Sequence, residues 1–245
     1  PPRCRGGCHP PVQNSFPKEE TSILVNWNEY LARYQQARGG WFFGGEDWSC
    51  DAQLVLPQEG KHPLLVNVYD ANLGRGEVPA LRGRTMVKLA RDYTLHIRAK
   101  GLVGGGVSGV AGLLGRDMDF GYPEALGGRM VTTSDRAFTK LVLGSLELRN
   151  GLAGRKKEYL RVYPSPVGEG WHTVEAGPAS LEGTVKGGSP WVNEAMQQSG
   201  SGLDTEESYR AAYPYFEEQM DEFLALLRSA ADALTRWPMP PDGKE

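Results

Sequence analysis

The chain has 245 residues, of which 40% are hydrophobic and 23% charged, and its formal net charge is −3. This length and composition are ordinary for a globular protein with a sizeable core. The small negative charge excludes a broad electrostatic attraction for nucleic acid, and no apolar run approaches the roughly 20 residues that cross a bilayer.

The first twenty residues are rich in Pro, Gly and charge and lack the apolar core of a signal peptide. Residues 1–20 therefore predict a disordered tail; a linker left by removal of an upstream segment and a wrongly assigned start are alternatives. Cys4 and Cys8 lie in this tail, where His9 alone cannot complete a metal site. Cys50 is expected to be a small buried side chain. This cysteine usage favours a reducing, cytoplasmic location, while an upstream anchor stays open.

Order is predicted to begin near Thr21, with a helix that ends at Gly39 and Gly40. The segment WFFGGEDW follows and carries Trp41, Phe42, Phe43 and Trp48. These aromatic residues either pack in the core or, if exposed, form a surface for protein or ligand recognition.

A series of strands is expected next, over residues 52–56, 63–71, 84–90 and 93–100. In the last of them Leu95 and Ile97 alternate with His96 and Arg98. This period of two residues is typical of a strand with one buried and one solvated face.

The run GGGVSG at 104–109 matches the spacing of a dinucleotide-binding loop. The strand before it is half polar, however, and the residues after it form a poor helix. The acids Asp117 and Asp119 also come too early to bind a ribose. We therefore interpret the run as a connection between strands and expect no cofactor.

A strand over GRMVTTS is followed by a predicted central helix at about 135–150, capped by Thr133 or Ser134. A strand pair is expected at 158–166 and 170–177. The last element is a helix at about 214–237, in which apolar residues recur with alternating spacings of four and three. This stripe indicates a helix packed on the sheet or, alternatively, a helix that pairs with a partner chain or a second copy.

Four histidines are spread along the chain, and none has the spacing of a helical metal site. His96 and His172 are predicted to face outward from strands in structural or surface roles. The alternative is that they meet Asp117 and Asp119 in space and form the site of a small-molecule hydrolase. No Gly-x-Ser-x-Gly motif is present to support an α/β-hydrolase.

Four segments form one pattern: Phe120–Glu124, Thr132–Asp135, Phe138–Leu143 and Leu148–Leu152. In these segments the chain resembles a group of uncharacterised bacterial proteins. The resemblance implies an α+β domain in which the helix at 135–150 packs on an antiparallel sheet, and it supplies no catalytic residues.

We therefore expect one α+β domain over residues 21–237, followed by a short tail at 238–245. The predicted function is a non-enzymatic, protein-binding or scaffold module, with a protein partner or self-association and no nucleic acid. A small-molecule hydrolase and the soluble portion of a membrane-attached protein are the alternatives.

Overall fold

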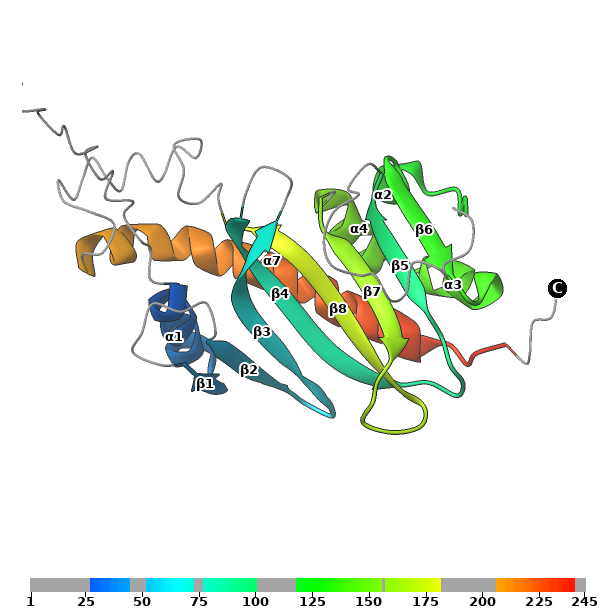
Figure 1. Ribbon diagram of the computed structural model, residues 1–245, viewed down its shortest axis with the longest axis horizontal. Coiled ribbons are helices and arrows are strands. Elements are labelled where there is room, and N and C mark those ends of the chain that lie inside the picture. Colours follow the sequence, from blue (N-terminus) through cyan, green and yellow to red (C-terminus); the bar gives the residue numbers. More distant parts are fainter. Residues whose placement is uncertain are drawn as a thin grey trace, which may run out of the picture.

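The computed structural model describes residues 27–44, 52–72, 77–100, 118–155, 157–181 and 206–240. In these ranges the chain forms an eight-stranded antiparallel sheet and a layer of helices (Figure 1). The strands are β1 (Trp41–Phe43), β2 (Gln53–Gln58), β3 (Lys61–Asn72), β4 (Glu77–Lys88), β5 (Leu95–Ala99), β6 (Arg129–Thr133), β7 (Tyr159–Pro164) and β8 (Trp171–Ser180). The helices are α1 (Trp27–Arg38), α2 (Pro123–Leu126), α3 (Arg136–Val142), α4 (Leu146–Gly154) and α7 (Glu206–Arg236). The predicted α+β class and the antiparallel sheet are confirmed.

The strands lie in the order β1-β2-β3-β4-β8-β7-β5-β6. The expected pair at 158–166 and 170–177 is present as β7 and β8. Strand β8 lies between β4 and β7 and joins the half of the sheet formed by β1 to β4 to the half formed by β5, β6 and β7. The paired strands β4 and β8 are far apart in sequence.

The long helix α7 crosses behind the sheet and contacts α1, α3 and α4, so the four helices form one layer (Figure 1). Its apolar stripe is buried from Phe216 to Leu234 against this chain's own sheet, while Trp237 is half exposed. Gly83 of β4 allows this close packing, because a Cβ atom there would lie 2.2 Å from Leu227 Cδ1. The stripe is therefore core packing.

Two predicted helices have other bounds in the structure. The helix expected at 135–150 is divided into α3 and α4, because Gly144 interrupts it and the Ser145 Oγ accepts a hydrogen bond from Leu148 N as a new N-cap. The cap of α3 is Asp135, one residue beyond the predicted positions. Helix α7 begins at Glu206 and contains Pro214, which is exposed.

The opposite face of the sheet is covered by no helix in the described ranges, and we call it the open face. One row of directly paired residues crosses all eight strands on this face: Trp41, Val55, Leu65, Arg84, Glu175, Arg161, His96 and Thr132. On each strand, the residues directly before and after the row position in sequence point to the helices and contribute to the core. None of the described helices combines the length and apolar character needed to span a membrane.

Candidate functional site: the open face of the sheet

A buried glutamate, Glu175 of β8, organises the centre of the open face. Its side chain is fully buried, and it accepts hydrogen bonds from both neighbouring strands. Arg84 Nε of β4 donates to Oε2 at 2.7 Å and Tyr159 Oη of β7 donates to Oε1 at 2.6 Å. Arg161 also donates to Oε1, and Tyr163 Oη donates to Oε2 at 3.2 Å. We call these five residues the Glu175 cluster.

The electrostatics of the cluster keep Glu175 ionised. Burial alone would raise the pKa of Glu175, but the hydrogen bonds from Tyr159, Arg161 and Arg84 lower the pKa to about 2. A carboxylate with this pKa, with both oxygens occupied by donors, is poorly suited to accept a proton at neutral pH. The cluster therefore fixes the directions of its side chains rather than offering a general base.

Arginine side chains on the open face are stacked on tyrosines. The Arg161 guanidinium lies 4.7 Å from the ring centroid of Tyr159, and that of Arg82 lies 4.6 Å from the ring of Tyr69. Arg82 Nε also donates to the Asn67 side chain at 3.2 Å. These contacts hold the cationic groups in fixed positions on the sheet.

His96 lies on the open face, beside Arg161 and Tyr159. Burial and the neighbouring Arg161 and Arg98 lower the pKa of His96 to about 4, so the imidazole is neutral at pH 7. His172 lies on the opposite, helix-covered face and is fully buried. Its Nε2 accepts from Tyr93 N at 3.0 Å and its Nδ1 donates to Gly170 O.

The prediction that His172 faces outward is therefore wrong, because residues 172, 174 and 176 of β8 form its core side. The structure does not bring the two histidines together. Asp119 lies before α2 and accepts a hydrogen bond from Gly121 N at 2.8 Å, as in a turn. Asp117 lies outside the described residues.

The predicted aromatic segment is divided between the core and the surface. Trp41 and Phe43 of β1 are 58% and 61% exposed, while Phe42 between them packs against the core. Trp41 is on the open face, in the row that contains Glu175, and Phe43 shares its side of the strand. Trp48 lies outside the described residues.

The glycine run at 104–109 and all three cysteines also lie outside the described residues. Among the residues that are described, no group of three His, Cys, Asp or Glu side chains is arranged to hold a metal ion.

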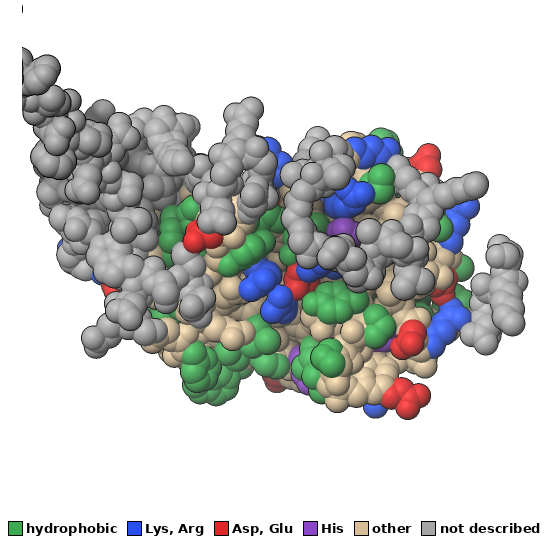
Figure 2. Space-filling view, in the orientation of Figure 1, with side chains coloured by type: hydrophobic (Ala, Val, Ile, Leu, Met, Phe, Trp, Pro, Cys, Tyr) green, Lys and Arg blue, Asp and Glu red, His purple; other side chains and the backbone are tan. Residues whose placement is uncertain are grey.

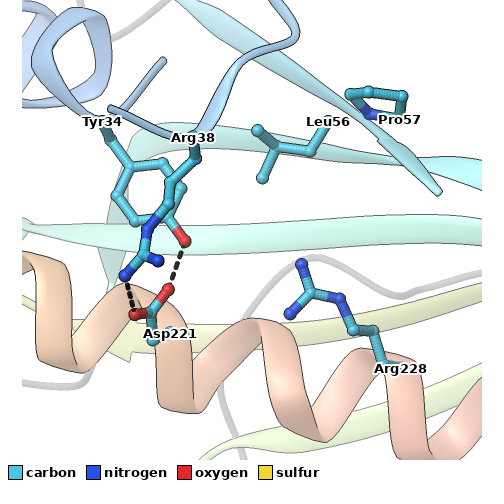
Figure 3. Close-up of a pocket in the computed structure, with 6 residues that line it drawn as sticks. All are labelled: Tyr34, Arg38, Leu56, Pro57, Asp221 and Arg228. Carbon is cyan, nitrogen blue, oxygen red and sulfur yellow. Dashed lines mark hydrogen bonds and ion pairs between the residues drawn. The ribbon is translucent and has the colours of Figure 1, made fainter. Parts of the chain in front are cut away.

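A small polar depression of about 190 Å³ lies on the other side of the sheet, between α1, β2 and α7 (Figure 3). Tyr34 Oη and Arg38 of α1 both point to Asp221 of α7, each at 2.5 Å, and Arg228 lies farther along the same helix. Burial and the hydrogen bond to Asp221 raise the pKa of Tyr34. These contacts join α1 to α7, and we assign them a structural role.

The Glu175 cluster was not predicted from the sequence. A signal was present in YLRVYP, where Tyr159, Arg161 and Tyr163 alternate with apolar residues and must share one strand face. Glu175 and Arg84 gave no such signal, because only the pairing of β8 with β4 and β7 brings them to the same row.

No protein-family model matches the chain, and a search of curated proteins finds no match. Among solved structures, the chain is similar to the mycobacterial trehalose monomycolate transport factor A, TtfA, with 13% sequence identity and a TM-score of 0.43. The match covers 88% of this chain and 98% of that chain.

Proposed function

We propose that this domain is a non-enzymatic protein-binding module and that the open face of its sheet is the binding surface. One observation carries the proposal: Trp41 and Phe43, two large aromatic side chains, are more than half exposed on the face that also carries the Glu175 cluster. Trp, Tyr and Arg are the residues that most often dominate the energy of protein interfaces.

The shape of the surface supports the same function. The sheet gives a broad face without a described helix, and Figure 2 shows green side chains gathered near β1 and β2, with blue side chains toward the centre. The arginines are held by Glu175 and by tyrosine rings, so a partner would order few of them on binding. Strand β1, which carries these aromatic side chains, lies at the edge of the sheet and pairs only with β2 among the described strands. Its free edge is a place where an extended segment of a partner can pair.

Photo-crosslinking in the native host tests this function. A photoreactive phenylalanine replaces Trp41 or Phe43 in separate variants, and matched variants carry it at Leu146 or Val167, which are 57% and 67% exposed elsewhere. We expect discrete protein adducts from positions 41 and 43 and none of the same mass from positions 146 and 167. Equal adducts from all four positions, or none from 41 and 43, would contradict the proposal.

A further inference from the structure

The charge on the open face is opposite in sign to that of the whole protein. The described open-face side chains of β4, β5, β7 and β8 include five cations, which are Arg82, Arg84, Lys88, Arg98 and Arg161. Glu175 is the only acid among them, and it is buried. The chain as a whole has 27 basic and 30 acidic residues. The open face is therefore a cationic surface on an acidic protein.

Two of these cations keep donors for a ligand. Arg84 uses Nε for Glu175, and among the described residues no other acceptor contacts its side chain, which is 40% exposed. Arg82 uses Nε for Asn67 while its guanidinium is stacked on Tyr69. In both residues the terminal N–H groups remain, in the planar arrangement that matches a carboxylate.

We propose that the open face binds an acidic segment of a partner protein, whose carboxylates pair with Arg82 and Arg84. This inference rests on the proposed function and names the chemistry of its partner. Strand β1 is three strand spacings from β4, which is about 14 Å, or four to five residues of extended chain. One short segment thus reaches the arginines with its acids while an apolar residue contacts Trp41 or Phe43.

The same surface is less suited to nucleic acid. Single-stranded nucleic acids bind by stacking bases on aromatic rings next to basic groups. Here the rings next to the basic groups, those of Tyr69 and Tyr159, already contact the guanidinium groups of Arg82 and Arg161. The exposed rings of Trp41 and Phe43 lie on β1, three strands away from the arginines of β4. The net charge of −3 also opposes a polyanion that extends beyond the face.

Fluorescence titration with defined probes tests the inference. The probes are a short labelled peptide of alternating Glu and Val, the same peptide with Gln for Glu, and an oligo(dT) strand. The full chain is expected to bind the Glu peptide at least tenfold more tightly than the Gln peptide, and added salt should weaken that binding.

The double variant Arg82→Gln/Lys88→Gln does not touch Glu175, so the cluster stays intact. We expect it to bind the Glu peptide about tenfold more weakly than the unaltered chain. The control Arg136→Gln/Lys140→Gln removes the same charge from exposed positions on α3 and should change the affinity by less than about twofold.

Three results would overturn the inference: equal binding of the Glu and Gln peptides, equal weakening by both double variants, or tighter binding of oligo(dT). Crosslinks from positions 41 and 43 together with any of these results would leave the binding module in place and remove only its acidic partner. Tight Glu-peptide binding without such crosslinks would instead place an acidic ligand on this face outside a protein complex and contradict the inference as stated.

Discussion

At the scale of single residues, the two buried glutamates among the described residues show how different surroundings shift the pKa of the same group in opposite directions. Glu175 has four donors and remains ionised. Glu158, directly before β7, is 9% exposed; its Oε1 accepts from Arg155 at 3.0 Å, whereas its Oε2 has no hydrogen-bond partner among the described residues. Burial raises the pKa of Glu158 to about 7, although Arg155 and Arg129 oppose the rise and Glu222 adds to it. Glu158 is therefore a source of pH-dependent stability.

The raised pKa of Glu158 predicts a loss of stability as the pH rises. The folded state binds the proton more tightly than the unfolded state, in which the pKa is about 4.5. The favourable contribution is complete below pH 4.5 and is lost as the pH rises through 7. Relative to Glu158→Gln, the free energy of unfolding of the unaltered chain should fall by about 3 kcal/mol between pH 4.5 and 8.

Urea unfolding at a series of pH values measures this difference. Glu218→Gln makes the same chemical change at an exposed position on α7 and should leave the pH profile nearly unchanged. His96, with a lowered pKa of about 4, adds stability that is present above pH 6.5 and lost as the pH falls toward 4. Both Glu158→Gln and Glu218→Gln retain His96, so this opposite trend cancels when each variant is compared with the unaltered chain. Parallel profiles for Glu158→Gln and the unaltered chain would exclude Glu158 as the titrating group.

At the scale of elements, the start of α4 is capped by one hydroxyl group. Ser145 is buried, and its Oγ accepts from Leu148 N at 3.3 Å at the first turn of α4. Ser145→Ala removes this acceptor and is expected to lower the free energy of unfolding by about 1 kcal/mol. The same change at Ser229, inside α7, replaces a residue whose hydroxyl donates to Leu226 O and should be neutral or slightly stabilising.

Thermal and urea unfolding of the two alanine variants would compare them directly. Equal stability of Ser145→Ala and Ser229→Ala would mean that Ser145 does not act as the cap of α4.

At the scale of the whole molecule, sequence periodicity predicted where helices and strands lie along the chain better than it predicted which of them lie side by side. The alternation around Leu95 and Ile97 and the apolar stripe of α7 each follow from one segment, so both were predictable. The placement of His172 was not, because its phase on β8 depends on which side the helix layer covers. The Glu175 cluster needed still more, since its donors come from β4 and β7 on either side of β8.

The contact between α7 and the sheet joins both halves of the molecule, and it gives the last prediction. Leu227 is fully buried and lies against Gly83 of β4. Leu227→Asp places a charge in the core and should cost more than about 4 kcal/mol, a large share of the stability of a domain. Ala225→Asp adds the same side chain on the exposed side of α7 and should cost no more than about 1 kcal/mol. Circular dichroism and size-exclusion chromatography distinguish the two roles of the stripe: loss of folded protein at Leu227→Asp indicates core packing, whereas a folded variant that only changes its oligomeric state would show that the stripe pairs with another chain.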